Sequence, residues 1–175
     1  FVAEDIALFM PVGGACFYAI TPEHTHPSYM FVLHFDDRTS TRMSGRTITG
    51  THGTVFALSP GIPHQELPSD TPPRYICIMI DPGFFEEQYR SYSRSSKPPK
   101  YRGELFPAGH DLLPVLRRFM IEADSGMPGS GAVRDALGVE ICHSLIRSLI
   151  GTHSPKERLA ERVEVNRVIE YLHAH

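Results

Sequence analysis

The sequence predicts a mainly β protein that ends in helices. Short apolar runs recur at intervals of about 8–12 residues as far as Ile80, separated by turn residues. From Leu112 onward the apolar residues recur three or four positions apart, which is the period of a helix. The 15 prolines and 14 glycines are concentrated in the first 130 residues. We therefore expect an antiparallel β-sandwich or barrel followed by an antiparallel helix pair.

Branched and aromatic residues mark the expected strands. One or two short strands are expected between Ile6 and Ile20, the clearer one at Cys16–Ile20, and an exposed hairpin over Thr39–Thr49. The strongest strand patterns are at Tyr29–Phe35, Thr54–Leu58 and Arg74–Ile80. No helical pattern interrupts this region, which argues against a parallel βαβ fold. A tight proline and glycine loop, 59–63, then presents His64.

The helical part begins after a short helix over Phe84–Tyr92 and a serine- and proline-rich loop over Arg90–Lys100. One amphipathic helix starts near Asp111. A second carries an apolar stripe and stops at Gly151, and the stripe consists of Val133, Leu137, Ile141, Leu145 and Leu149. This stripe is either core against the barrel or a seam with a partner helix, and we expect it to mediate a homodimer.

The domain plan that follows has four parts. Residues 1–83 form the barrel, 84–110 a connecting segment and loop, 111–151 the dimerising helix pair, and 152–175 a linker and the start of a further domain. A helix over Val165–His173 runs into the last residue without a capping signal, and the first residue is Phe1. We therefore expect the chain to be a piece of a longer protein.

Composition excludes several classes of protein. The chain has 175 residues, 41% hydrophobic and 21% charged, with a net charge of −3, so bulk charge does not predict nucleic-acid binding. No apolar run reaches the length of about 18 residues that predicts a membrane span. Cys16, Cys77 and Cys142 are widely spaced in apolar sequence, which is typical of free thiols in a cytoplasmic protein.

Three histidines are the candidates for a metal site. His24 and His26 are two residues apart, so they share one face if this segment is extended. His64, presented by a later loop, would complete a set of three imidazoles able to hold one divalent transition metal such as zinc, nickel or iron. The alternatives are that these histidines line a pocket without a metal, or that they lie at the barrel mouth without any ligand.

The sequence resembles a known protein family in several motifs. The His24-x-His26 pair, Gly53 before a strand, and Pro60-Gly61-x-Pro63-His64 look like the two motifs of the cupin superfamily. The helix pair, followed by Val165-Asn166-x-Val168-Ile169-x-Tyr171-Leu172, is similar to one cupin architecture. That architecture is the N-terminal sensor and dimerisation domain of AraC-type transcription regulators, with the first helix of their DNA-binding domain.

The resemblance implies a fold and a function. The fold would be a small cupin-like antiparallel barrel, a double-stranded β-helix, that binds a small-molecule effector. The effector would enter between Glu23–Tyr29 and 59–66, with Tyr29, Phe31, Phe56 and Glu66 as its contacts. The helix pair would mediate dimerisation. DNA would be bound only through the C-terminal helix-turn-helix domain, which is missing here beyond its first helix, and no membrane is involved.

The sequence departs from the metal-binding cupin pattern at one place. Metal cupins usually carry a glutamate four or five residues after the second histidine, where this chain has Met30 and Phe31. Glu66 or His34 is then the fourth ligand to consider. No nucleophile–base set is present, so no catalytic residue is predicted. Two alternatives remain, which are a metal-dependent cupin oxygenase or isomerase acting on a small acid or sugar, and a dimerisation module with an empty barrel.

Overall fold

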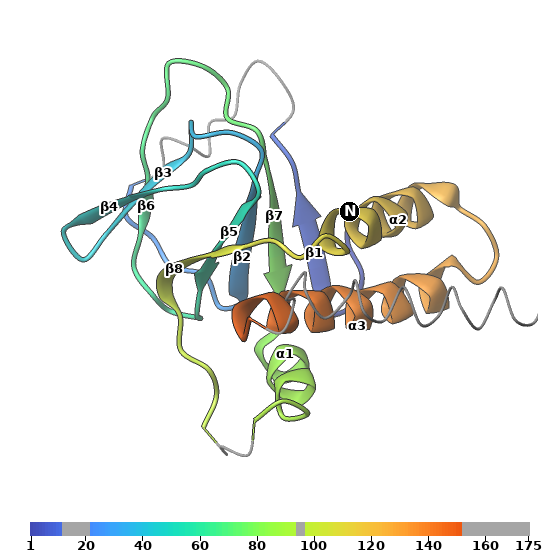
Figure 1. The fold of residues 1–175 in the computed structure, drawn as a ribbon. Helices are drawn as coiled ribbons and strands as arrows, with labels where there is room; N and C mark the ends of the chain where they lie inside the picture. Colours follow the sequence, from blue (N-terminus) through green and yellow to red (C-terminus); the bar gives the residue numbers. More distant parts are fainter. Residues whose placement is uncertain (12–21, 94–96, 152–175) are drawn as a thin grey trace, which may run out of the picture.

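A computed structural model describes residues 1–11, 22–93 and 97–151, and within them two antiparallel sheets lie beside a layer of helices (Figure 1). One sheet has five strands in the order β1-β7-β2-β5-β8, and the other has three in the order β4-β3-β6. The strands are β1 (Ile6–Phe9), β2 (Tyr29–His34), β3 (Ser40–Met43), β4 (Arg46–Thr49), β5 (Thr54–Leu58), β6 (Gln65–Glu66), β7 (Tyr75–Ile80) and β8 (Arg102–Pro107). The predicted fold class, mainly antiparallel β with C-terminal helices, is confirmed.

The central strand β2 is buried on both faces, because it lies between two hydrophobic cores. Tyr29, Phe31 and Leu33 belong to the core between the large sheet and the helices. Met30 and Val32 belong to the core between the two sheets, which we call the inner core. Successive strand residues point to opposite faces, so an uninterrupted apolar run is what such a position requires.

Three helices, α1 (Pro82–Tyr89), α2 (Leu112–Ser125) and α3 (Ser130–Leu149), cover the other face of the large sheet (Figure 1). Asp81 caps α1 by accepting a hydrogen bond from the Phe84 amide at 3.0 Å. α2 and α3 pack against each other, and Phe119 and Ile141 are fully buried where they meet the core. Among the described residues, none of the helices has the length and apolar character of a membrane span.

The two sheets meet closely at Gly103 of β8. A Cβ atom at this residue would lie 2.5 Å from side-chain atoms of both Ile48 and Met43, which come from the small sheet. The backbone there has φ +85°, a conformation that favours glycine. Since no side chain fits, Gly103 lets β8 extend the large sheet while it packs against the β3–β4 hairpin.

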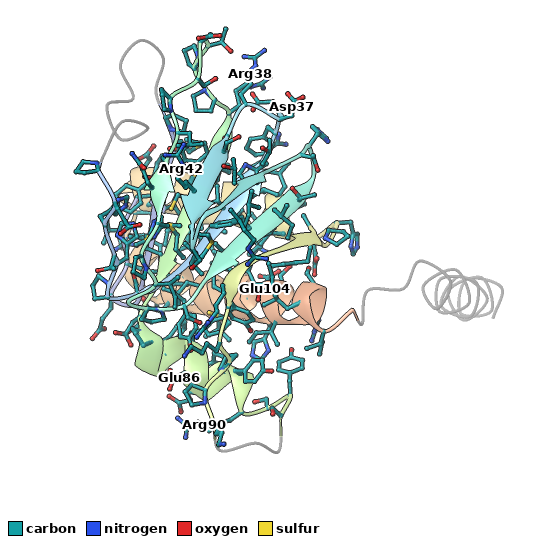
Figure 2. All side chains as sticks on the ribbon, turned by 90° about the vertical axis from the view of Figure 1, so that its left-hand side faces the viewer. Asp37, Arg38, Arg42, Glu86, Arg90 and Glu104 are labelled. Carbon is teal, nitrogen blue, oxygen red and sulfur yellow. The ribbon has the colours of Figure 1, made fainter. Side chains whose placement is uncertain are left out.

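Charged side chains lie around the outside of this frame. Figure 2 shows Asp37 and Arg38 at one end of the molecule, and Glu86 of α1 and Arg90, which directly follows α1, at the other. Arg38 lies 3.8 Å from the carboxylate of Asp36 and is largely exposed, so this pair adds little to stability. Burial of the two cores is therefore the main source of stability.

The structure differs from the predicted elements at β8 and β6. The sequence assigned Arg102–Pro107 to a connecting segment, but it pairs with β5 from Thr54 to Leu58. The two residues of β6, which the sequence did not assign to a strand, pair with β3. The expected strand Cys16–Ile20 and helix Val165–His173 lie outside the described residues.

The cysteines agree with the expectation of free thiols where the structure describes them. Cys77 and Cys142 are free, and Cys142 is buried in the core under the helices. Burial raises the pKa of the Cys142 thiol, so it stays protonated and unreactive. Cys16 lies outside the described residues.

Candidate metal centre

Two segments that are forty residues apart meet at His24 and His64. The His24 amide donates to the His64 carbonyl at 2.9 Å, and the His64 amide donates to the His24 carbonyl at 3.0 Å. The two residues thus form an isolated antiparallel bridge next to β6. The Gly61 amide also donates to the His26 carbonyl at 2.9 Å. The Pro60-Gly61 loop and the His-x-His segment are therefore held side by side by their backbones.

Four side chains converge at this bridge, namely His24, His26, His64 and Glu66. One potential ligand atom from each lies within 4.8 Å of all the others. The Nε2 atoms of His24 and His26 are 3.2 Å apart. The Glu66 carboxylate lies 3.7 Å from His24 Nε2 through one oxygen and 3.7 Å from His64 Nε2 through the other. We call this set the histidine–glutamate cluster.

Backbone carbonyls fix the orientation of two of the imidazole rings. His24 Nδ1 donates to the Pro22 carbonyl at 3.0 Å, and His64 Nδ1 donates to the Ile62 carbonyl at 2.9 Å. A carbonyl oxygen only accepts hydrogen bonds, so in the neutral rings the proton is on Nδ1 and the lone pair on Nε2. Both Nε2 lone pairs then face the centre of the cluster, which is how metal-binding histidines are commonly held.

His26 and His64 favour the neutral form that a metal requires. Burial is the main cause that lowers the pKa of both His26 and His64. The charge on neighbouring histidines lowers both values further, while Glu66 opposes the shift. His64 is only 1% exposed, and its Nε2 atom has no hydrogen-bond partner. A buried acceptor without a partner costs free energy unless a ligand supplies one.

The donor set and its spacing fit a transition metal. Two nitrogens that each bind zinc at about 2.1 Å are about 3.4 Å apart in tetrahedral geometry. The 3.2 Å between His24 Nε2 and His26 Nε2 is close to that value. Three imidazoles and one carboxylate suit zinc, nickel or iron better than calcium or magnesium, which prefer oxygen ligands. The cluster can therefore hold such an ion.

The carboxylate of the cluster comes from a different place than in the metal-cupin pattern. Met30 and Phe31, at the usual glutamate positions, point into the inner core and the helix-side core. Glu66 on β6, two residues after His64, provides the carboxylate instead. His34, the other predicted fourth ligand, is not among the four residues that the structure brings together. It is buried at the end of β2 and its ring packs on Gly50.

The predicted effector contacts lie on two sides of the large sheet. Tyr29 and Phe31 are 1% and 0% exposed in the core under the helices, where the Tyr29 hydroxyl donates to the Pro99 carbonyl at 2.9 Å. Phe56 lies in the inner core and Glu66 in the histidine–glutamate cluster. Sequence periodicity places Tyr29 and Phe31 together but does not say which core they enter.

The predicted dimer stripe is divided between core and surface. Leu137, Ile141 and Leu145 are 3%, 0% and 0% exposed and pack inside the chain, and Leu149 is partly buried against the same core. Only Val133 is exposed, at 43%. Three of the five side chains are thus already covered within one chain, and dimerisation through this stripe stays a prediction.

The sequence reasoning missed the carbonyls of Pro22 and Ile62, which orient the rings. Each of them lies two residues before the histidine it binds, in a Pro22-x-His24 and an Ile62-x-His64 arrangement. A local hydrogen bond from a histidine Nδ1 to a carbonyl two residues earlier needs only a turn in the backbone. The prolines at positions 22 and 63 are the signal in the sequence that could have indicated such turns.

Comparisons with known proteins place this fold among solved structures. No family model matches the chain, and no curated protein matches it. The chain is similar in structure to the AraC-like transcriptional activator CuxR, with a TM-score of 0.45 and 10% identity over 83% of this chain and 61% of that one. It is also similar to ToxT K231A from Vibrio cholerae strain SCE256, with a TM-score of 0.42 and 12% identity over 83% and 53% of the two chains.

A further similar structure contains iron. HEPD of Streptomyces albus, solved with 2-hydroxyethylphosphonate and Fe(II) bound, matches with a TM-score of 0.27 and 21% identity over 71% of this chain and 28% of that one. The chain thus spans 61% of CuxR and 53% of ToxT. These likenesses concern the fold, so the function is argued from the residues of the cluster.

Proposed function

We propose that this chain is the ligand-sensing and dimerisation part of a bacterial AraC-type transcription regulator. Its ligand site would be the histidine–glutamate cluster, occupied by one divalent transition metal, and by a small-molecule effector that binds beside it. The cupin-like motifs around His24 and His64, and the helix pair after the barrel, support the proposal. A homodimer would present two DNA-binding domains, which would follow this chain in the full-length protein.

The observation that carries the proposal is the Nε2 atom of His64. This atom is buried, has no hydrogen-bond partner, and belongs to one of the four side chains that converge in the cluster. His34 also has an unpartnered ring nitrogen, but the Nε2 atom of His64 differs because three other potential ligands converge beside it. A metal held by His24, His26, His64 and Glu66 would satisfy this atom. Bound there, the ion would act as a Lewis acid toward an anionic group of an effector.

Binding at the cluster would tie together two segments that the His24–His64 bridge and the hydrogen bond from Gly61 to His26 already join. His24 and His26 come from the segment before β2. His64 directly precedes β6, and Glu66 is its last residue. A ligand that prefers one arrangement of these segments would shift the population of barrel conformations by its difference in affinity. Because β2 packs on the helical layer through Tyr29 and Phe31, such a shift would reach α2 and α3.

The proposed effector contacts are Phe56 and Glu66. Phe56 is on the inner face of β5, among the side chains between the two sheets, and Glu66 belongs to the cluster itself. Tyr29 and Phe31 would serve as the packed connection to the helices, and would not touch the effector. An effector in this position would combine a polar group at the cluster with a small apolar part toward the inner core.

The test uses the full-length protein that contains this chain. Its binding to DNA, selected from genomic fragments, is measured with and without zinc, and again after His26→Ala. We expect sequence-specific binding as a dimer whose affinity changes with metal in the natural protein and does not change in the variant. A protein that binds no DNA, or that binds equally well in every case, would contradict the proposal.

The metal-dependent cupin enzyme remains the competing function, since the same cluster could serve it. Oxygen consumption or isomerisation of small acids and sugars by the iron- or nickel-loaded chain distinguishes the two. Turnover that is lost on His26→Ala would favour the enzyme, and binding without turnover would favour the sensor.

A further inference from the structure

A cavity lies on the helical side of the large sheet, away from the histidine–glutamate cluster. It has a volume of about 520 Å³, within the range of about 300–1,000 Å³ that is typical of small-molecule sites. Its walls come from the segment after α1, the start of α2 and the second half of α3, with α1 and α3 side by side in Figure 1. The lining residues are Ser91, Tyr92, Asp111, Glu140, His143, Ser144 and Arg147.

One polar face of α3 forms most of this wall. Glu140, His143, Ser144 and Arg147 recur three or four residues apart, so they share a face of the helix. The buried apolar residues of α3 lie on another face, against the sheet. Polar side chains at these positions are not required by the packing of the helix, because the sheet-facing stripe already anchors it.

Tyr92 bonds to both Arg147 and His143, and these bonds fix which ring nitrogen of His143 carries the proton. The Arg147 guanidinium, which can only donate, donates through Nε to the Tyr92 oxygen at 3.2 Å. The Tyr92 hydroxyl therefore donates its own proton to His143 Nδ1, at 2.6 Å. Burial and the charge of Arg147 lower the pKa of His143. The ring is thus neutral with its proton on Nε2, which makes it a fixed hydrogen-bond donor.

Ser144 provides an independent sign of a ligand. It is only 3% exposed, it lines the cavity, and its hydroxyl has no hydrogen-bond partner. Serine hydroxyls inside helices commonly bond back to the carbonyl four residues earlier, as Ser148 does to Ser144 at 2.9 Å. An unpartnered hydroxyl at 3% exposure is costly unless a molecule in the cavity binds it.

The charges of the wall decide which class of ligand fits. Arg147 is positive, and Asp111 and Glu140 are negative, so an anion alone meets two carboxylates and a cation alone meets the guanidinium. Glu140 also lies 3.4 Å from Arg118, but both side chains are more than half exposed and such a pair holds weakly. Glu140 and Arg147 are separated by about 10 Å along the helix, from a rise of about 1.5 Å per residue.

We propose that this cavity is a second ligand site, for a linear amino acid whose carboxylate and ammonium groups are several ångströms apart. The carboxylate contacts Arg147 and the Nε2–H of His143. The ammonium group contacts Glu140, and Ser144 binds a polar atom between the two ends. This site is independent of the metal centre and of the function proposed above, and it lies on the helix that the dimer proposal uses.

Three probes of equal chain length test the proposal by calorimetric titration of the whole chain: ε-aminocaproate, caproate and hexylamine. We expect ε-aminocaproate to bind one equivalent, and the two singly charged probes to bind at least about tenfold more weakly, since each lacks one charged contact. Binding of caproate or hexylamine as tight as that of ε-aminocaproate would overturn the proposal, and so would no binding of ε-aminocaproate.

Variants locate the binding. Arg147→Gln and Glu140→Gln, both at exposed residues, should each weaken ε-aminocaproate binding about tenfold, and Ser144→Ala should weaken it severalfold. Arg118→Gln, the matched control for Arg147→Gln, removes a competitor for Glu140 and should leave binding unchanged or tighter. His26→Ala in the metal centre should have no effect. Loss of binding in either control, or full binding in Arg147→Gln, would contradict the assignment.

Discussion

His34 is a buried titratable residue that belongs to neither ligand site. It is 3% exposed, its Nδ1 has no hydrogen-bond partner, and a Cβ at Gly50 would lie 2.3 Å from its ring. Burial lowers the pKa of His34 from 6.5 to about 4, although Asp36 opposes the shift. The close contact explains why residue 50 is glycine, and the missing partner explains why the ring stays neutral.

This shift makes stability dependent on acid. The pKa in the folded chain is below that in the unfolded chain, so the contribution to stability is intact above pH 6.5 and lost as the pH falls toward about 4. The expected loss is about 3 kcal/mol at most, from about 1.4 kcal/mol per pKa unit. Urea unfolding across this range should show a shallower dependence on pH in His34→Phe than in the natural protein. Identical pH profiles would contradict this account of His34.

Glu66 decides whether the cluster has an anionic ligand. Glu66→Gln keeps the shape and removes the charge, so zinc affinity should fall at least about tenfold in competition with a chromophoric chelator. Glu87→Gln on α1 is the matched control, because it removes an exposed carboxylate on the helical side of the large sheet. Equal affinities of Glu66→Gln and the natural protein would remove Glu66 from the ligand set.

The cluster was predicted from the sequence only in part. The alternation of His24 and His26 and the loop before His64 were enough to place three imidazoles together. The choice between Glu66 and His34 could not be made, because it depends on pairing between β3 and β6. Two residues are too few for a periodic pattern to indicate that pairing.

At the scale of elements, β8 shows where sequence periodicity fails. Phe106 is the only buried residue of this strand, so no apolar alternation marks it. It is a strand because β5 offers a free edge and Gly103 fits between the sheets. The strands β2, β5 and β7 were predicted correctly, since both their faces enter cores and their apolar runs are continuous.

The helix α3 contributes to stability through its buried stripe. Ile141 is fully buried, so Ile141→Ala should lower the free energy of unfolding by about 2–5 kcal/mol. Val133→Ala, at a residue 43% exposed, is the control and should change it by less than about 1 kcal/mol. Urea denaturation measures both values. Equal effects would mean that the stripe does not pack on the sheet as described.

An exposed apolar group near the connection of α2 and α3 is where we expect a dimer contact. Ile121, Met127 and Val133 are 70%, 64% and 43% exposed. We expect Ile121→Glu to weaken dimerisation through these residues, because the substitution would bury a charge at the interface. Sedimentation velocity should show a shift toward monomer. A dimer unaffected by Ile121→Glu and by Val133→Glu would place the contact elsewhere.

At the scale of the whole molecule, the histidine–glutamate cluster and the helices lie on opposite sides of one sheet. The cluster joins the His-x-His segment to β6. The strand β2 follows that segment and contributes side chains to the core under the helices. A ligand that binds only the folded chain stabilises it by about 2.7 kcal/mol when its concentration is 100 times the dissociation constant. Metal binding should therefore be visible as a higher unfolding temperature of the entire chain.

The most direct measurement is a calorimetric titration of the metal-free chain with zinc, followed by thermal unfolding. We expect one zinc per chain and a higher unfolding temperature. Both effects should be lost in His64→Ala and in His26→Ala, the second of which changes a less buried residue. A natural protein that binds no zinc, or that binds it equally well after both substitutions, would contradict the central claim that these residues form a metal centre.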